Sequence, residues 1–321
     1  MSGRSVSITG ATGFVGSHLA EAMRDAGWRV RAIVRPDSPK PVPKGVELVR
    51  SALDVASLTR AAAYSEVLVH AAGVIRAPHA SAFEGVNVGG TQAAVDAANA
   101  VGARVILISS LAAAGAGTPA RPAREENEPQ PLTAYGRSKL AAELVVRSSA
   151  RVPWTIVRPS AVYGPRDRGF LPLFRFASRG WFPLVAGPAT AFTLIHVEDL
   201  ARGIVLAAAD ERAAGETLFF GHGRPQTTDE VLHGLARALG RRYRPWRVPS
   251  PVMSAAAYAG EVLWLIGRQP MVDTTRLREF GAGGFVCSVD RAQEVLGFRA
   301  TTDWPEGAER TAQWYRERGW I

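Results

Sequence analysis

Short apolar runs alternate with stretches of helical periodicity along the first half of the chain. The first run holds Val6 and Ile8, and later runs predict strands over Arg29–Val34, Val46–Val49, Val67–His70 and Arg104–Ile108. Apolar residues at helical spacing between these runs predict helices over Phe14–Ala26, Ser57–Tyr64 and Phe83–Val101. Regular repetition of strand and helix is typical of a parallel sheet with helices on both faces. We therefore expect an α/β fold built on a doubly wound parallel sheet.

The second half of the chain has a more varied pattern and predicts a smaller, mixed lobe. Pro165–Gly187 is rich in aromatic residues, whereas Thr217–Phe220 has the pattern of a strand that returns to the sheet. Helices are expected over His196–Ala209, Asp229–Leu239 with Thr228 as its cap, Val252–Ile266, Val289–Leu296 and Pro305–Arg318. We expect a sheet domain over residues 1–165 and a lobe over 166–321, in which about 190–222 returns to the sheet.

Three glycines follow the first predicted strand at three-residue intervals. Gly10 permits a tight turn, Gly13 lets the backbone approach a pyrophosphate, and Gly16 lets the next helix lie close to the sheet. The free N–H groups at the start of that helix favour an anion. This arrangement indicates a dinucleotide site, with a glycine-rich turn that binds nothing as the alternative. Its predicted contacts are Gly10, Thr12, Gly13, Phe14 and Val15.

The end of the second predicted strand distinguishes between two cofactors. A carboxylate at this place binds the ribose 2′-hydroxyl of NAD, whereas the guanidinium of Arg35 suits the 2′-phosphate of NADP. We expect NADP(H) to be preferred, and NAD(H) is the alternative if Arg35 is only a solvated surface residue. Asp54, which follows the third strand, either contacts the adenine or caps the next helix.

Small and polar residues follow the next two strands. Ala71, Ala72 and Gly73 let the backbone pass close to a ligand. Ser109 and Ser110 follow the strand Arg104–Ile108. Because ligands of such sheets bind at the carboxyl ends of the strands, we expect these residues to meet at the cofactor site. His70 is interpreted as a core histidine, and no metal site is expected.

Tyr135 and Lys139 are four positions apart at the start of a predicted helix, so they share one face of it. A phenol is a poor base at neutral pH, but a nearby ammonium lowers its pKa. Tyr135 could then exchange a proton with a substrate oxygen that Ser110 also binds. Taken alone, the pair would be interpreted as part of an exposed helix face. Its place beside a cofactor turn and a serine at a strand end favours catalysis.

Composition and charge restrict the partners. No apolar run approaches the roughly 20 residues of a membrane span, so the helix at 252–266 is expected to line an apolar pocket, with docking on a membrane surface as the alternative. The net charge of +9 comes from scattered residues, nearly all arginine, which suits an anionic cofactor better than a nucleic acid. Cys287, the single cysteine, is interpreted as a core residue and fits a reducing cytoplasm, and we see no signal peptide.

The chain resembles the extended short-chain dehydrogenase/reductase family, within the NAD-dependent epimerase/dehydratase superfamily. The resemblance covers the first 200 residues, and its looser continuation is nearest to the dihydroflavonol-reductase-like and 3β-hydroxysteroid-dehydrogenase-like branch. The segments that carry it are Thr9–Gly16, Asn87–Thr91, Ser109–Ser110, Tyr135–Lys139, Arg158–Pro165 and His196–Ala201.

This resemblance implies a Rossmann-type sheet and a role for each matched residue. Tyr135 would be the acid/base, Lys139 would also hold the nicotinamide ribose, and Ser110 would bind the substrate oxygen. Pro159 to Val162 would lie against the nicotinamide, and Asn87 would help to position the active site. The implied protein is a cytoplasmic oxidoreductase and a homodimer that acts on a hydrophobic ketone or secondary alcohol.

Two departures from the family pattern leave alternatives open. Ser51 and Ala52 stand where the family usually has a Gly-Asp pair. The segment Leu111–Gly115 lacks the Val-Tyr-Gly ending that is common in sugar-modifying members. A sugar-nucleotide epimerase or dehydratase with tightly bound NAD is the first alternative, which would need cationic groups such as Arg166, Arg168 and Arg278 for a diphosphate. A noncatalytic NADP-sensing protein is the second. The intact Ser110, Tyr135 and Lys139 argue against it.

Overall fold

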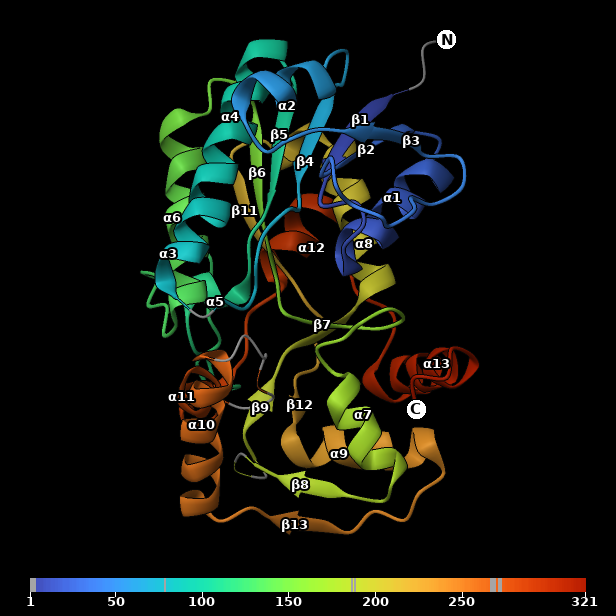
Figure 1. The fold of residues 1–321 in the computed structure, drawn as a ribbon, viewed down its shortest axis with the longest axis vertical. Coiled ribbons are helices and arrows are strands. Elements are labelled where there is room, and N and C mark those ends of the chain that lie inside the picture. Colours follow the sequence, from blue (N-terminus) through green and yellow to red (C-terminus); the bar gives the residue numbers. More distant parts are fainter. Residues whose placement is uncertain (1–3, 78, 186, 188, 266–269, 271–272) are drawn as a thin grey trace.

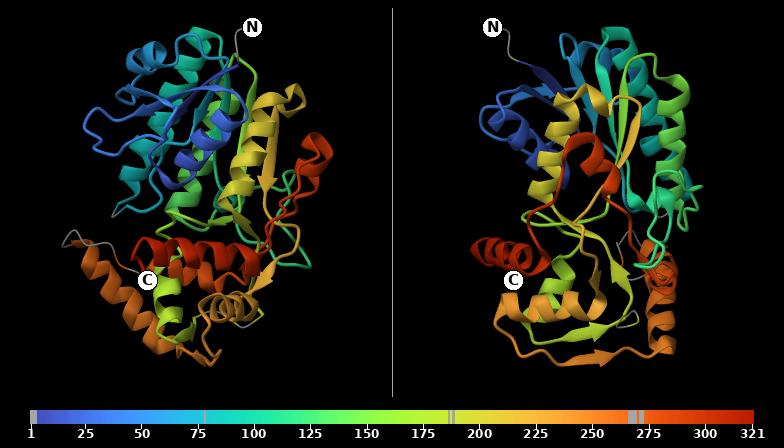
Figure 2. Two further views of the ribbon diagram at one scale, coloured as in Figure 1. Left: turned by 90° about the vertical axis from the view of Figure 1, so that its right-hand side faces the viewer. Right: turned by 180° about the vertical axis from the view of Figure 1, so that it is seen from behind.

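The structure is a computed structural model that describes residues 4–321 except 78, 186, 188, 266–269 and 271–272. The molecule is elongated, with a large sheet and its helices in one half and a smaller mixed lobe in the other (Figure 1, Figure 2). The chain crosses between the halves several times. Among the described residues, no helix has both the length and the hydrophobicity needed to cross a bilayer.

One seven-stranded parallel sheet organises the larger half. Its strand order is β11-β6-β5-β4-β1-β2-β3. The strands span Ser5–Thr9 (β1), Arg29–Val34 (β2), Glu47–Arg50 (β3), Val67–His70 (β4), Arg104–Ile108 (β5), Trp154–Pro159 (β6) and Glu216–Phe220 (β11). The predicted parallel sheet is confirmed, and so is the return of Thr217–Phe220, which pairs with β6. Strand β6 itself was not predicted from the sequence.

Helices cover both faces of this sheet because its strands carry apolar side chains on both sides. On one face, Ile8 and Val69 pack with α1 (Phe14–Asp25) and α8 (Val197–Ala209). On the other face, Leu68 and Leu107 pack with α2 (Val55–Ala61), α4 (Gly90–Val101) and α6 (Ala134–Ser149). The layered arrangement confirms the doubly wound fold and brings the carboxyl ends of β1, β4 and β5 to one edge.

The long helix predicted over Phe83–Val101 is divided into three parts. A short α3 (Ala80–Phe83) leads into a π-helical segment, Glu84–Gly89, and then into α4. Single π-turns inside helices are frequently found at functional sites. Here the π-helical segment contains Asn87, one of the predicted site residues, which is buried.

The smaller half packs around a second apolar core. Its members include Phe174 from α7 (Leu171–Ser178), Leu235 from α9 (Thr228–Leu239), and Trp304 and Tyr315 from α13 (Trp304–Glu317). The predicted cap of α9 is wrong by one residue. Thr227, not Thr228, accepts the N–H of Glu230, and Glu230 accepts the N–H of Thr227 in return, which forms a complete capping box.

Short strands and further helices complete this half. The strands are β7 (Ala161–Tyr163), β8 (Phe182–Leu184), β9 (Ala191–Phe192), β10 (Leu194–His196), β12 (Gln226–Thr227), β13 (Pro245–Arg247) and β14 (Gly284–Phe285). The helices are α10 (Ser250–Leu265), α11 (Thr274–Gly281) and α12 (Asp290–Leu296), with a short α5 (Leu111–Ala114) in the larger half. Ile266, the predicted last residue of the apolar helix, lies outside the described residues.

Candidate active site

The glycine turn between β1 and α1 is tightly packed against the end of β4. Gly10 has a φ of 69°, and a Cβ there would lie 2.7 Å from the backbone nitrogen of Ala72. A Cβ on Gly16 would lie 2.2 Å from the carbonyl oxygen of Gly10, so helix α1 starts closer to the turn than any other residue would allow. Gly13 precedes α1, and its N–H donates to Gly10 at 2.9 Å. The turn therefore has the backbone shape and the free helix N-terminus that suit a pyrophosphate.

His70 holds the ends of β1 and β4 together. Its Nδ1 is 2.9 Å from the hydroxyl of Thr9, which also accepts the N–H of Ala72 at 3.2 Å. Burial, reinforced by the charge of Lys139, lowers the pKa of His70 to about 3. The ring is therefore neutral, and the prediction of a core histidine is confirmed, although Nε2 has no hydrogen-bond partner among the described residues.

Arg35 and Asp54 lie beyond the turn at the ends of β2 and β3. Arg35 is exposed at the residue that follows β2, where its side chain can reach solvent or a ligand. Asp54 caps α2 and accepts the N–H of Ser57 at 2.9 Å, a hydrogen bond that lowers the pKa of the carboxyl group. Of the two roles considered for Asp54, this geometry supports the cap.

Tyr135 lies at the first turn of α6, which Thr133 caps through the N–H of Gly136. Its phenol lies near Ser110, the residue that caps α5 just beyond β5. Burial raises the pKa of Tyr135, the side chain of Ser110 lowers it, and the charge of Glu279 on α11 raises it. The prediction that the pKa of Tyr135 is lowered is therefore wrong, because the effect of burial outweighs that of Ser110.

Lys139 lies one helical turn beyond Tyr135 and is buried. Burial lowers the pKa of Lys139 to about 8, and the charge of Glu143 opposes that shift. A Cβ on Gly73 would lie 4.0 Å from the ammonium nitrogen of Lys139. The ammonium therefore lies directly beside the backbone that follows β4, at the edge of the sheet where the glycine turn also lies.

Asn87 connects this backbone to α6. Its side-chain oxygen accepts the N–H of Val74 at 2.9 Å, and its amide donates to the Val74 carbonyl at 3.0 Å. The same amide donates to the hydroxyl of Ser138 at 2.9 Å, and this hydroxyl donates to the Tyr135 carbonyl at 2.8 Å. The π-helical segment thus places the side-chain amide of Asn87 between the backbone that follows β4 and helix α6.

A buried ion pair beneath the site was missed by the sequence analysis. Arg158 on β6 donates to both carboxylate oxygens of Glu143 on α6, at 3.0 and 2.7 Å, and both side chains are buried. Ser109, predicted to bind the cofactor, donates its hydroxyl to Glu143 at 2.5 Å. The signal available in the sequence was the four-residue spacing of Lys139 and Glu143, which places both on one helix face.

The other predicted residues lie around Tyr135 and Lys139. Pro159 ends β6 and Val162 lies half-buried in β7, on the side where the sheet meets the smaller half. Arg166 is paired with Glu21 at 2.6 Å and donates to Ser17 at 2.9 Å, and Arg168 lies over the ring of Trp320. Arg278 on α11 is exposed. Two of the three arginines considered for a diphosphate are thus engaged elsewhere.

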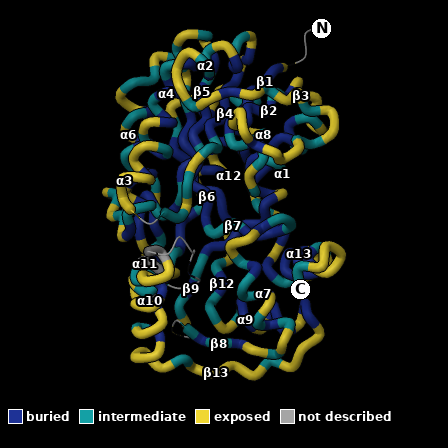
Figure 3. Tube along the Cα trace, in the orientation of Figure 1, coloured by how far each residue is buried: buried dark blue, intermediate teal, exposed yellow. Residues whose placement is uncertain are grey.

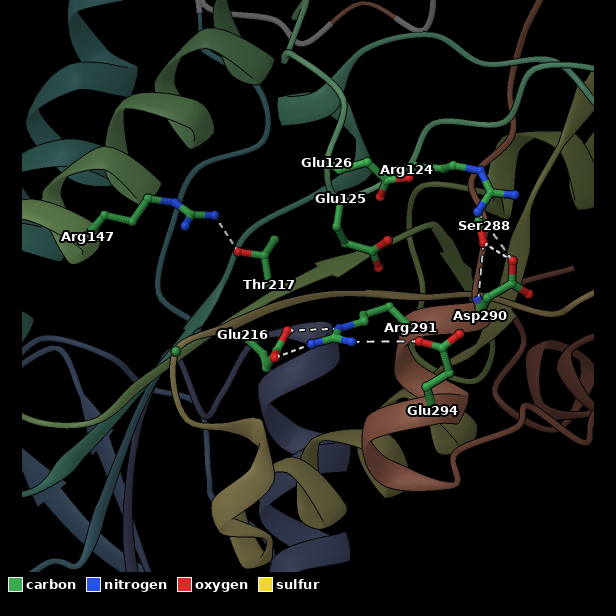
Figure 4. A pocket seen from close by; sticks show the side chains of 11 residues that line it. Arg124, Glu125, Glu126, Arg147, Glu216, Thr217, Ser288, Asp290, Arg291 and Glu294 are labelled. Atoms are coloured by element: carbon green, nitrogen blue, oxygen red, sulfur yellow. Dashed lines mark hydrogen bonds and ion pairs between the residues drawn. The ribbon is translucent and has the colours of Figure 1, made fainter.

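A separate polar groove of about 520 Å³ lies along β11, beside Glu125 and Glu126 of the loop before α6 (Figure 4). Some of its charges are paired within the groove, since Arg291 pairs with Glu216 at 2.5 Å and Arg124 lies 3.6 Å from Asp290. Tyr135 and Lys139 do not line it. The groove is therefore distinct from the candidate active site.

The model of the "NAD dependent epimerase/dehydratase family" matches residues 6–219, and the chain belongs to this family. The matched range contains the glycine turn, Ser110, Tyr135 and Lys139. Members of this family bind NAD(P), so the chain is an NAD(P)-dependent enzyme of the oxidoreductase type.

Individual relatives include reductases. A ceramide reductase of Caulobacter vibrioides (strain NA1000 / CB15N) is 34% identical over 98% of this chain and 96% of its own length. A 4-hydroxy-2-methyl-3-oxo-4-farnesyl-3,4-dihydroquinoline-1-oxide ketoreductase of Stigmatella aurantiaca is 29% identical over 95% of both chains. Among solved structures, MoeE5 in complex with UDP-glucuronic acid and NAD is 26% identical and superposes with a TM-score of 0.76 over 98% of this chain and 99% of its own.

Proposed function

We propose that this protein is an NADP(H)-preferring oxidoreductase that interconverts a hydrophobic ketone and the corresponding secondary alcohol. The observation that carries the proposal is the placement of Tyr135, at the start of α6, beside Ser110, at the start of α5, at the carboxyl edge of the sheet. It brings a proton donor and a second hydroxyl to one point, beside the turn that suits a dinucleotide. The proposed setting is the cytoplasm, with a homodimer as the expected assembly.

Each residue of the site has a defined task in this reaction. The chemistry that a bound nicotinamide supplies is hydride transfer to or from the substrate carbon. In reduction, Tyr135 gives its proton to the carbonyl oxygen, and in oxidation it takes the proton from the hydroxyl. Ser110 donates a hydrogen bond to the same oxygen. Lys139 lies one helical turn away from Tyr135 and is proposed to bind the cofactor.

The cofactor preference rests on Arg35. Its exposed guanidinium follows β2, at the position where a carboxylate would select NAD. Gly10, Thr12, Gly13, Phe14 and Val15 would hold the pyrophosphate, and Ala71, Ala72 and Gly73 would pass beside the nicotinamide half. Lys139 is proposed to bind the nicotinamide ribose, because its ammonium lies next to Gly73.

An apolar substrate is supported by the surroundings of Tyr135. The ring of Phe83 lies 6.2 Å from the ring of Tyr135, and α10 and α11, of which the first is almost entirely apolar, pack together on this side of the molecule. Two of the relatives are named for the reduction of ceramide and of a farnesyl-bearing quinoline oxide, both large and apolar.

A sugar-nucleotide epimerase is the second candidate, because the similar structure of MoeE5 holds UDP-glucuronic acid and NAD. That function needs free cations for a diphosphate. The engagement of Arg166 by Glu21 and the stacking of Arg168 on Trp320 make it the weaker candidate. A cofactor that copurifies with the protein and is never released during turnover would favour it.

The test of the proposal is the variant Tyr135→Phe, assayed by NADPH oxidation with a panel of long-chain ketones. Loss of the proton donor is expected to reduce kcat/KM by roughly 10²- to 10⁴-fold. NADPH binding, measured by calorimetry, should be retained. Tyr64→Phe, which changes an exposed tyrosine far from the site, is the matched control. Wild-type turnover by Tyr135→Phe on every active substrate would exclude this mechanism.

A further inference from the structure

Helix α10 is apolar on the side that packs inward and on the side that faces solvent. Met253, Ala257 and Gly260 are buried, and α10 packs against α11. Glu261 is the single charged residue of α10, and it accepts hydrogen bonds from the N–H and the hydroxyl of Thr274 on α11, at 3.1 and 2.6 Å. The buried side of the helix and its one charge, which is itself exposed, thus both take part in a helical hairpin.

A second apolar stripe of α10 is exposed. Val252 is 54% exposed and Val262 57%, and the stripe also contains the exposed residues Ala255, Ala256, Ala259 and Leu263. At 100° per residue these positions cover about a third of the helix circumference. Figure 3 shows the outer edge of α10 as exposed. A continuous apolar stripe without a charge is unusual on a protein surface and indicates an interaction site.

Positive charge and aromatic rings lie on the segment that leads from α9 to α10 and on the strand paired with it. Arg241, Arg242, Arg244 and Arg247 precede α10, all are exposed, and none is paired with a carboxylate among the described residues. Trp246, in β13, is 50% exposed. Trp181, directly before the paired strand β8, is also exposed. Figure 1 shows β13 at the outer end of the smaller half, leading to the end of α10.

We propose that the α10 stripe, these four arginines, Trp181 and Trp246 form a docking face for an anionic lipid bilayer. A helix with an apolar face beside basic residues binds at the interface of a bilayer. Tryptophan is enriched at the same depth, where its ring is apolar and its N–H can be hydrated. Each arginine near an anionic surface adds electrostatic attraction.

The positive charge also argues against a second copy of this chain as the occupant. In a symmetric dimer the same surface meets itself, so the four unpaired arginines of each copy would be brought toward those of the other. Asp229, which lies beside this segment, is already engaged by the hydroxyl of Tyr243 at 2.7 Å. An anionic lipid surface supplies the missing negative charge, and a copy of the chain does not.

The docking face is connected to the candidate active site through α11. The carboxylate of Glu279 on α11 lies close enough to Tyr135 to raise the pKa of its phenol, and Arg76, after β4, donates to the Pro270 carbonyl at 3.2 Å. The α10–α11 hairpin therefore borders both the docking face and Tyr135. If the proposed function holds, on which this step rests, a bilayer-dissolved ketone reaches Tyr135 beside the hairpin.

The experiment is sedimentation of the full-length protein with vesicles, without substrate. The probes are vesicles of equal parts phosphatidylcholine and phosphatidylglycerol, and vesicles of phosphatidylcholine alone. We expect binding to the anionic vesicles that weakens as salt is added. Val262→Glu, and separately the replacement of all four arginines by serine, should each lower vesicle affinity by roughly tenfold or more. Leu144→Glu, at an exposed leucine on α6, is the matched control and should bind normally.

Failure of this proposal can be distinguished from failure of the proposed function. Reduction of a water-soluble ketone by NADPH, measured without vesicles, tests the chemistry and should be unchanged in Val262→Glu. Wild-type protein that does not sediment with anionic vesicles, or variants that sediment as wild type does, would overturn the docking face. A dimer that Val262→Glu dissociates, with no vesicle binding, would assign the stripe to a second copy instead.

Discussion

At the scale of single residues, Arg35 is the side chain on which the proposed preference for NADP(H) rests. Replacing it with glutamate would remove a partner of the 2′-phosphate and place a negative charge beside it, whereas the 2′-hydroxyl of NADH would gain a hydrogen-bond acceptor. We therefore expect Arg35→Glu to weaken NADPH binding by roughly tenfold or more and to leave NADH binding equal or tighter. Calorimetric titration of both cofactors measures this difference.

The control is Arg29→Glu, because Arg29 is an exposed arginine at the opposite end of the same strand. It makes the same change of net charge far from the carboxyl edge of the sheet. If Arg29→Glu weakens NADPH binding as much as Arg35→Glu does, the effect comes from the total charge of the protein. If neither variant weakens NADPH binding, Arg35 is a surface residue. A sugar-nucleotide epimerase that holds NAD then becomes the better-supported function.

The residues themselves were predictable to different degrees. That Tyr135 and Ser110 lie near each other, with Lys139 one turn beyond Tyr135, could be predicted from their spacing and from the place of Ser110 at a strand end. The partnership of Glu143 with Arg158 could not, because charged residues on an amphipathic helix normally face solvent and the sequence does not show that this one is buried. The pKa of Tyr135 was predicted in the wrong direction because the sequence shows a neighbouring lysine but not the extent of desolvation.

At the scale of elements, α11 modifies the chemistry of α6. Burial raises the pKa of Glu279 to about 7, and its carboxylate raises the pKa of Tyr135. Glu279→Gln removes that negative charge, so the phenolate needed for alcohol oxidation forms at lower pH. We expect the rise of kcat/KM for alcohol oxidation to move to lower pH in the variant, measured as a full pH profile.

Glu126→Gln neutralises an exposed carboxylate elsewhere and should keep the wild-type profile. A profile of Glu279→Gln that is unshifted, or shifted to higher pH, would show that the charge of Glu279 does not act on the catalytic proton. Reduction needs the protonated phenol, so its decline at high pH should also begin at lower pH in Glu279→Gln.

The elements that sequence patterns predicted best are the central strands. β2, β4 and β5 begin and end where the apolar runs do, because strands buried on both faces are continuous apolar segments. The two-residue strands β9, β12 and β14 are too short to leave a pattern. The π-helical segment at Glu84–Gly89 was predicted as ordinary helix, because the contacts of Asn87 with Val74 and Ser138 come from tertiary structure.

At the scale of the whole molecule, Arg166 ties the smaller half to the sheet. It lies just after β7 with a φ of 70°, and its guanidinium pairs with Glu21 and donates to Ser17, both on α1. Both charged side chains are about one third exposed, with 35% for Arg166 and 31% for Glu21, so solvent screens the attraction. A double-mutant cycle with Arg166→Ala and Glu21→Ala is expected to give a coupling of about 0.5–1 kcal/mol.

The cycle is measured by urea unfolding, monitored by tryptophan fluorescence, at low and at high salt. The coupling should shrink as salt is added, because a pair that is about one third exposed is screened. Arg24 and Asp25 form a more local pair on α1, and their cycle gives the comparison, since it joins no separate elements. A zero coupling for Arg166 and Glu21 would mean that this ion pair does not help to hold the two halves together.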